Sequence, residues 1–386
     1  MSPASSTTPC LMIVAGEASG DQIAARAVTC LRTLSPRTRV LAVGGPALTA
    51  AGAELVAPME SLAVMGLKDV LLRLPVIWWT WRKLRRAIRR ERPQLLVLVD
   101  APGFNLRLAR AVRAEVPRLV YYISPKYWAW KAGRLESVAR QTDRQALIFP
   151  FEEADYRRVG GHPLFVGHPV LDLVDHAPER EAARAALGLT PGETVLGLFA
   201  GSRPGELRRH LPLLRDCASV LADQPLRLVL QIPERIQARE LVRSAGFPGN
   251  VRVVEGRFHE MLRAADLGLV ASGTASLEAA VLGLPHLVYY KLDELAAWLA
   301  ERIVKAPYAS PVNLAAGREL VPELLNRRAS GVLMADWVVR SLRQGGLAAA
   351  GDELARVTRE NLGGPGASQR VAELLLEELR TAGVQP

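Results

Sequence analysis

Short aliphatic runs alternate with amphipathic helical patterns along both halves of the chain. In the first half the runs occupy residues 11–15, 40–43, 95–99, 119–123 and 146–149. In the second half they occupy residues 195–199, 226–232, 251–254, 267–271 and 286–290. Strands that are apolar along their whole length are buried on both faces, and alternation with helices is typical of a parallel, doubly wound sheet. The pattern therefore predicts two α/β domains of the Rossmann-like type.

The length and the apolar content agree with two domains. The chain has 386 residues, of which 49% are hydrophobic, and a typical domain has about 100–200 residues. We predict a first domain over residues 1–170 and a second over residues 171–345, with Gly167-His168-Pro169 near their connection. Residues 346–386 are predicted to be helical, and packing of this tail back onto the first domain is an open alternative.

Composition narrows the class of partner. The formal net charge is +10, carried mostly by arginine, so nucleic acid, anionic lipid and phosphorylated small molecules are the candidates. Three widely spaced cysteines, Cys10, Cys30 and Cys217, suggest neither a disulfide framework nor a zinc site, so we expect a reducing cytoplasm. We expect no signal peptide, and no segment approaches the roughly 20 apolar residues of a spanning helix. The chain is expected to be soluble or peripheral to a membrane.

A turn in the second half has the composition of a phosphate site. Ser272-Gly273-Thr274 follows the run at 267–271 and opens an alanine-rich helical pattern. Glycine permits the tight turn, and the first amides of the helix, together with its dipole, favour an anion such as a diphosphate. Glu278, one turn further on, is placed to accept hydrogen bonds from sugar hydroxyls. The alternative is an ordinary strand-to-helix turn.

A second loop of the same kind follows the run at 195–199. Gly201 and Ser202 can present backbone amides to phosphate, and Arg203 adds a fixed fork of donors. Together with the turn at 272–274, this loop predicts a diphosphate pocket. Asn313 lies in a later turn, where it either lines the same site or caps the next helix.

Carboxylates follow two runs of the first half. Glu17 and Asp21 flank the small residues after the run at 11–15, and Asp100 directly follows the run at 95–99. Ligands of parallel sheets bind beyond the carboxyl ends of the strands, where a carboxylate with a raised pKa can act as general base. The alternative is that these acids cap helices or turns. A loop at 124–131, with two tryptophans and two lysines, either covers a sugar phosphate or packs into a core.

Residues 69–90 combine aromatic, aliphatic and basic side chains. Such a segment suits an interfacial helix, whose rings enter the headgroup boundary while its arginines meet anionic lipid. The residues expected to touch the membrane are Leu71, Leu72, Val76, Ile77, Trp78, Trp79 and Trp81. A core helix with a solvated basic end is the alternative. Nucleic acid is disfavoured because no recognition-module motif is present.

Taken together, these motifs resemble those of the lipid-A-disaccharide synthases, a family of inverting glycosyltransferases with the two-domain GT-B fold. The resemblance runs in family order from about residue 11 to residue 325. The matching stretches are 15–21, 100–105, 124–130, 149–152, 167–169, 201–206, 272–278 and 313–320. It implies two Rossmann-like domains with parallel sheets facing across a cleft, the first for the acceptor and the membrane, the second for the UDP-sugar donor.

The resemblance also implies a reaction and a set of site residues. UDP-2,3-diacylglucosamine would transfer its sugar to the 6-hydroxyl of 2,3-diacylglucosamine 1-phosphate, which gives a β-1,6-linked disaccharide 1-phosphate and UDP. Asp100 matches the general base and Glu17 a second catalytic position, while Arg203 would meet the diphosphate and Glu278 the ribose. The positions implied for the donor are Gly201, Ser202, Arg203, Glu206, Ser272, Gly273, Thr274, Glu278 and Asn313. Gly103 departs from the family, which more often has an acidic residue there.

The resemblance implies neither a metal nor a cofactor, and it places the chain in the cytoplasm, peripheral on the inner face of the plasma membrane. It leaves a homodimer open. Two alternatives are a GT-B transferase or UDP-sugar epimerase with another, soluble substrate, and a membrane-surface UDP-binding protein without turnover. The apolar and basic segment at 69–90 argues against the first, and the joint presence of the candidate polar residues argues against the second.

Overall fold

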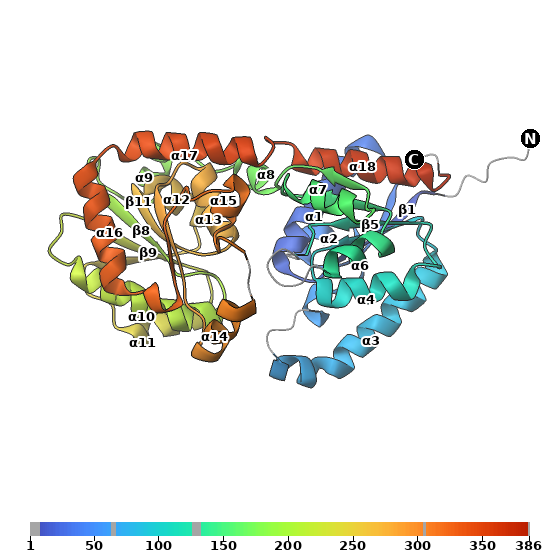
Figure 1. Ribbon diagram of the computed structural model, residues 1–386, viewed down its shortest axis with the longest axis horizontal. Helices are drawn as coiled ribbons and strands as arrows, with labels where there is room; N and C mark the ends of the chain where they lie inside the picture. The colour runs from blue at the N-terminus through green and yellow to red at the C-terminus, as the bar shows by residue number, and fades with distance from the viewer. Residues whose placement is uncertain (1–7, 63–66, 126–132, 304–305, 385–386) are drawn as a thin grey trace, which may run out of the picture. The chain divides into compact units, whose positions relative to one another are not determined.

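The computed structural model describes residues 8–62, 67–125, 133–303 and 306–384. The chain folds as two compact units, unit 1 (Met1–Pro169 with Gly363–Pro386) and unit 2 (Val170–Leu362). Each unit has a parallel sheet with helices on both of its faces (Figure 1). The predicted α/β class with two parallel sheets is confirmed.

Within its described residues, unit 1 holds a seven-stranded sheet in the order β3-β2-β1-β4-β5-β6-β7. The strands are β1 (Cys10–Ala15), β2 (Arg39–Gly44), β3 (Glu54–Pro58), β4 (Leu95–Val99), β5 (Arg118–Tyr122), β6 (Arg144–Leu147) and β7 (Pro163–Phe165). The helices are α1 (Ala18–Leu34), α2 (Pro46–Ala50), α3 (Leu67–Glu91), α4 (Pro102–Val112), α6 (Gly133–Gln141), α7 (Glu152–Arg158) and α18 (Ala367–Thr381).

Different helices cover the two faces of this sheet. Successive side chains of a strand point to opposite faces, so each face has its own side chains to bury. Met12 and Val14 of β1 share a buried cluster with Leu84 of α3 and Leu108 of α4. Helices α1 and α18 pack against each other, and α18 also contacts β4 and β5. The C-terminal helix therefore completes a unit whose first strand begins at Cys10.

In the described part of unit 2, six parallel strands follow the order β10-β9-β8-β11-β12-β13. They are β8 (Val195–Phe199), β9 (Arg227–Ile232), β10 (Val251–Glu255), β11 (Leu267–Ala271), β12 (His286–Tyr290) and β13 (Glu323–Leu325). The helices are α8 (Val170–Val174), α9 (Arg180–Ala186), α10 (Pro204–Val220), α11 (Ile236–Ala245), α12 (Phe258–Ala264), α13 (Thr274–Val281), α14 (Glu294–Ile303), α15 (Pro311–Ala316), α16 (Gly331–Gln344) and α17 (Leu347–Asn361).

The C-terminal tail is divided between the two units. Helix α17 packs on α13 and α15, so unit 2 extends to Leu362 rather than ending at the expected residue 345. Helix α18 belongs to unit 1 and packs on α1. The boundary at residue 345 was wrong because amphipathic helices of similar pattern do not reveal which sheet they cover.

Each sheet has one point at which the strand order reverses, between β1 and β4 in unit 1 and between β8 and β11 in unit 2. The loops that leave two such neighbouring strands diverge to opposite faces, and ligands of open α/β sheets bind there. The loops that carry Glu17 and Asp100 follow β1 and β4, and those that carry Arg203 and Gly273 follow β8 and β11. The candidate residues therefore lie at the two reversal points.

Candidate functional site

In unit 1 the loops after β1 and β4 lie against each other. The last residues of the two strands are paired in register, so the chain leaves both strands at the same level. A Cβ atom on Gly16 would lie 3.3 Å from the Cβ atom of Ala101, closer than ordinary van der Waals contact. Glycine at this position lets the loop that carries Glu17 approach the loop that carries Asp100. Two of the predicted residues are thus brought to one place.

The backbone of Asp100 is held in an unfavourable conformation. Asp100 and Ala101 have φ angles of 46° and 45°, the left-handed region, which costs a non-glycine residue about 1–3 kcal/mol. The carbonyl of Asp100 accepts hydrogen bonds from the side-chain Nδ2 of Asn105 at 2.8 Å and from the hydroxyl of Tyr121 at 2.7 Å. Burial raises the pKa of Tyr121, so its hydroxyl stays a donor. These bonds fix where the Asp100 side chain leaves the sheet.

The two acids after β1 differ in role. Glu17 is exposed at the start of α1. Asp21 is buried, and its carboxylate accepts hydrogen bonds from the amides of Gly45 at 2.7 Å and Ala47 at 3.0 Å. Asp21 therefore satisfies the first amides of α2, as a capping residue does, whereas Glu17 lies at the surface.

In unit 2 the loop after β8 is organised around Glu206. Oε2 of Glu206 accepts hydrogen bonds from the amides of Ser202 at 3.2 Å and Arg203 at 3.3 Å. Gly201 has a φ of +96°, and a Cβ atom there would lie 2.7 Å from the same oxygen. The amide of Ser202 is therefore used inside the loop, contrary to the expectation that it faces phosphate. The guanidinium of Arg203 is half exposed, and its Nη1 lies 3.4 Å from Oε1 of Glu206.

The turn after β11 leaves an open space at the start of α13. Gly273 has φ 154° and ψ −161°, a region adopted almost only by glycine, and a Cβ atom there would have no neighbour within 4 Å. Thr274 begins α13, and while the amide of Ser276 donates to the carbonyl of Gly273 at 3.1 Å, the amides of Thr274 and Ala275 precede the first hydrogen bond of the helix. The side chain of Ser272 turns away, because its hydroxyl donates to the carbonyl of Ala309 at 3.0 Å. The backbone at Gly273 and Thr274 is the candidate anion-binding feature of this turn.

Asn313 is completely buried, and its hydrogen-bonding capacity is used within unit 2. Its amide nitrogen donates to the carbonyl of Val321 and to Glu323, both at 2.8 Å. Its oxygen accepts from the amides of Leu320 at 2.7 Å and Val321 at 3.0 Å. The expectation that Asn313 contacts the donor is not supported by this geometry.

The position of Asn313 nevertheless links it to the turn after β11. Glu323, its partner, also accepts hydrogen bonds from the amides of Ala309 and Ser310, each at 2.9 Å. The carbonyl of Ala309 in turn accepts a hydrogen bond from the hydroxyl of Ser272. Asn313 therefore supports the candidate anion site through Glu323 and the 309–310 backbone.

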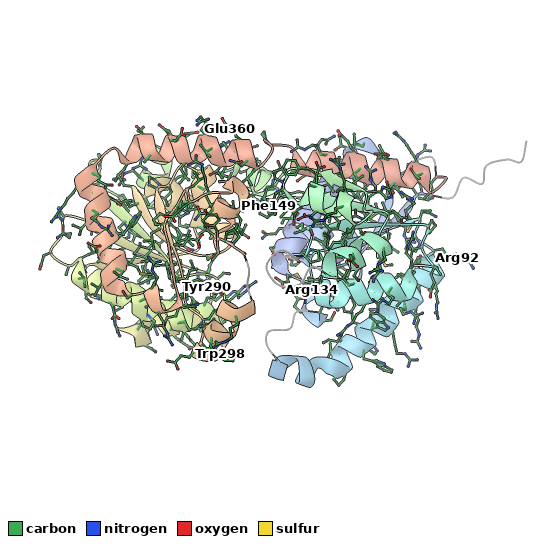
Figure 2. The ribbon with its side chains drawn as sticks, in the orientation of Figure 1. Arg92, Arg134, Phe149, Tyr290, Trp298 and Glu360 are labelled. Carbon is green, nitrogen blue, oxygen red and sulfur yellow. The ribbon has the colours of Figure 1, made fainter. Side chains whose placement is uncertain are left out.

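Two histidines that the motifs did not single out belong to this end of unit 2. Nε2 of His259 on α12 lies 2.6 Å from Oε2 of Glu278. His210 is fully buried between the rings of Tyr289 and Tyr290, the second of which is labelled in Figure 2. Burial lowers the pKa of His210. A lone histidine in a helical pattern carries no sequence signal of such contacts.

Neutral His210 joins the loop after β8 to the end of β12. Its Nε2 accepts from the amide of Lys291 at 3.3 Å, so its Nδ1 carries the proton and donates to the carbonyl of Ala200 at 2.9 Å. The hydroxyl of Tyr289 donates to the carbonyl of Phe199 at 3.0 Å. These contacts hold the Arg203 loop in a defined place.

On α3, the predicted membrane residues divide between surface and core. Trp78 and Trp79 are each 57% exposed and Val76 is 48% exposed. Arg82 lies over the ring of Trp78 at 4.6 Å, and Lys83 lies 5.2 Å from the ring centroid of Trp79.

The remaining residues of this set are less exposed or have side chains outside the described residues. Trp81 is partly buried and packs edge-on against Phe104 of α4, with ring centroids 5.6 Å apart, where α3 and α4 lie side by side (Figure 1), so part of its ring is engaged within unit 1. Ile77 is half-buried. The side chains of Leu71 and Leu72, and the tryptophan loop at 126–132, lie outside the described residues.

The described residues contain no helix of the length and apolarity needed to pass through a bilayer. They also contain no group of three or more His, Cys, Asp or Glu side chains gathered as metal ligands are.

Comparison with known proteins shows the family of this chain. The family model described as lipid-A-disaccharide synthetase matches residues 11–360. Lipid-A-disaccharide synthase of Anaeromyxobacter dehalogenans (strain 2CP-1) is 42% identical over 374 residues, which are 96% of this chain and 97% of that protein. The synthase of Azotobacter vinelandii is 41% identical over 95% of this chain and 97% of its own length. The chain belongs to the lipid-A-disaccharide synthase family.

Solved structures show the fold of this family member. UDP-GlcNAc 2-epimerase from Neisseria meningitidis, bound to UDP-GlcNAc, has a TM-score of 0.66 at 12% identity and covers 95% of this chain and 100% of its own. CalG4, the calicheamicin glycosyltransferase, has a TM-score of 0.59 at 18% identity over 96% of this chain and 98% of its own. At such identities the likeness concerns the fold alone, and it confirms the predicted GT-B class.

Proposed function

We propose that the chain condenses UDP-2,3-diacylglucosamine with 2,3-diacylglucosamine 1-phosphate into the β-1,6-linked disaccharide 1-phosphate and UDP. The observation that carries this proposal is the 42% identity to a lipid-A-disaccharide synthase over 96% of the chain. The arrangement of polar residues at the two strand-order reversals supports the same reaction.

In the proposed acceptor step, Asp100 acts as general base. Its carboxylate takes the proton of the acceptor 6-hydroxyl while that oxygen attacks the anomeric carbon of the donor. The new bond forms on the face opposite the diphosphate, which leaves with its bonding electrons as UDP, so the anomeric centre inverts. The fixed backbone of Asp100 and the adjacent Glu17 loop support this role, because a general base must be held within hydrogen-bond reach of its proton.

In the proposed donor site, Arg203 and the first amides of α13 bind the diphosphate. The exposed guanidinium and the open space before Gly273 support this assignment. Fixed donors aimed at the negative charge that develops on the leaving group lower the barrier. Glu278 is assigned to the ribose. Glu206 and Asn313 are proposed to support the site rather than to contact the ligand, since their side-chain polar atoms are engaged within unit 2, as is the backbone amide of Ser202.

The proposal includes peripheral binding to the inner face of the plasma membrane from the cytoplasm, through α3. Trp78 and Trp79 are exposed beside Arg82 and Lys83, the combination that suits an anionic headgroup region. Acylated substrates reside in a bilayer, so a surface that docks there brings the chain to them.

A transferase assay tests this function. Purified protein is mixed with both acylated substrates in detergent, and UDP release is followed together with the mass of the lipid product. We expect a disaccharide phosphate of the combined mass. UDP binding without any product would indicate that the chain uses a different acceptor. Turnover of UDP-N-acetylglucosamine without a lipid would favour a soluble substrate.

Replacement of the proposed base tests the mechanism. Asp100→Asn should lower kcat by about 100-fold or more, because a general base contributes roughly that factor, while the Kd for UDP stays within about twofold of wild type. Asp336→Asn, which alters an exposed acid on α16, serves as the matched control and should leave kcat unchanged. Activity of Asp100→Asn near that of wild type would place the base elsewhere.

A further inference from the structure

Glu278 and His259 meet although their helices follow strands that are far apart in the sheet. Helix α12 follows β10 and α13 follows β11, and β9 and β8 lie between these two strands. Nε2 of His259 nevertheless lies 2.6 Å from Oε2 of Glu278. The donor-site acid therefore has a partner that the fold, and not local sequence, supplies.

The start of α12 is anchored so that His259 keeps this position. The ring of Phe258 packs edge-on against Phe199 at the end of β8, with ring centroids 5.7 Å apart. The side-chain amide of Gln231 on β9 donates to the carbonyl of Gly256 at 3.0 Å, just before the helix. These contacts tie the first turn of α12 to the two strands that separate β10 from β11.

The chemistry of the pair leaves one carboxylate oxygen for a ligand. An ionised carboxylate only accepts hydrogen bonds, so Nε2–H of His259 donates to Oε2, and the short distance is typical of a charge-assisted bond. The Glu278 side chain is 13% exposed, so it has little freedom to turn. No described residue hydrogen-bonds to Oε1. That oxygen is suited to a ligand with hydroxyl donors.

We propose that His259 is a positioning residue for the donor nucleotide. It holds Oε2 of Glu278 so that Oε1 accepts hydrogen bonds from the ribose hydroxyls of a nucleoside diphosphate bound at the start of α13. His259 acts through Glu278 and does not itself touch the reacting atoms. This inference rests on the donor role proposed above for Glu278.

The test measures ribose selectivity, which a merely structural residue would not change. Kd values for UDP and 2′,3′-dideoxyuridine diphosphate are determined by titration calorimetry on the intact protein, and their ratio is the readout. Wild type should prefer UDP by on the order of tenfold, the effect of hydrogen bonds to a charged group. Glu278→Ala should bring the ratio near 1, and His259→Ala should lower it by about fivefold.

Two further variants separate positioning from folding. His259→Gln keeps a donor near the place of Nε2 and should restore most of the selectivity. His259→Ala should have no further effect in the Glu278→Ala background, because the two residues act in series. Glu260→Gln, on the next residue of α12, is the matched control and should keep the wild-type ratio.

The possible failures are distinguishable. If Glu278→Ala removes the selectivity and His259→Ala keeps it, or weakens both ligands equally, the inference on His259 is wrong and the donor role of Glu278 stands. If wild type binds the two nucleotides equally, or Glu278→Ala retains the preference for UDP, the ribose role of Glu278 is wrong and the inference falls with it.

Discussion

At the scale of single residues, buried polar side chains support the loops of the candidate site. Glu206, Asn313 and His210 are buried, and each hydrogen-bonds to backbone groups that lie outside its own helix. If a buried polar group loses its hydrogen-bond partner, its full desolvation free energy is left uncompensated, so these contacts resist rearrangement. Of the residues proposed to contact a ligand, Glu17 is exposed and Arg203 is half exposed. Support and contact are thus separated between different residues.

A second buried histidine predicts a pH dependence of stability. His286 in β12 is fully buried, its Nδ1 donates to the carbonyl of Leu284 at 2.8 Å, and burial lowers its pKa to about 4. In the unfolded chain this histidine has a pKa of about 6.5. The folded state thus binds fewer protons between these values, so stability is complete above pH 6.5 and falls as the pH drops toward 4.

The expected loss between pH 7.5 and pH 5 is about 2 kcal/mol in the free energy of unfolding. Urea denaturation at the two pH values measures it in wild type and in His286→Leu, which lacks the titrating group and should lose about 2 kcal/mol less. His176→Gln, at an exposed histidine, should behave as wild type. Equal pH dependence of wild type and His286→Leu would contradict the prediction.

At the scale of elements, α3 presents two chemically different surfaces. Leu84 and Ile88 are fully buried against the sheet of unit 1, while Trp78 and Trp79 face away and remain largely exposed. Arg85 and Arg89 pair with Glu115 and so attach the basic end of the helix to the unit. The helix is therefore both a core element and a carrier of exposed aromatic groups.

Replacement of the exposed rings tests the membrane role of α3. Trp78→Ser with Trp79→Ser should reduce binding to vesicles that contain anionic lipid by about tenfold, since apolar burial and charge attraction act together at an interface. Trp298→Ser on α14 is the matched control, because Trp298 is also exposed and also has an arginine, Arg302, over its ring at 3.8 Å (Figure 2). Co-sedimentation at low and high salt measures the binding, and undiminished binding of the double variant would exclude this surface.

At the scale of the whole molecule, the last helix returns to the unit in which the chain begins. Glu378 of α18 is buried, and Arg118 at the start of β5 donates to it at 2.6 Å. Arg144 at the start of β6 lies 3.8 Å from its other oxygen. These residues stand 260 and 234 positions apart in the chain (378 − 118 and 378 − 144). Unit 1 is thus built from two separate stretches that must meet before its sheet is covered.

Loss of this ion pair should destabilise unit 1. Glu378→Leu removes the carboxylate that both partly buried guanidinium groups face and leaves Arg118 only Asp143, at 3.5 Å, so the free energy of unfolding should fall by about 3 kcal/mol. Hydrogen exchange should then accelerate in α1 and β5 and remain unchanged in the strands of unit 2. Glu377→Gln, an exposed acid on the same helix, should have no such effect. Unaltered exchange in Glu378→Leu would show that α18 is held without this acid.

The sequence by itself determined the alternating architecture and the position of most strands. The predicted runs at 95–99, 195–199, 267–271 and 286–290 coincide with β4, β8, β11 and β12, because strands buried on both faces need continuous apolar residues. The same logic located Asp100, Arg203 and Gly273 directly after strands. Strands β3, β7 and β13 were missed, since β3 and β7 have few or no buried residues and β13 is three residues long.

Only the tertiary structure decided which polar side chains face a ligand and which face the protein. Asn313 and Ser202 look like donor-site residues in sequence, yet their partners Glu323 and Glu206 engage them within unit 2. The pairing of His259 with Glu278 and the burial of Trp81 against Phe104 depend on the packing of different elements. A local pattern reports periodicity and turn chemistry, whereas hydrogen bonds between distant residues arise only when separate helices and strands pack together.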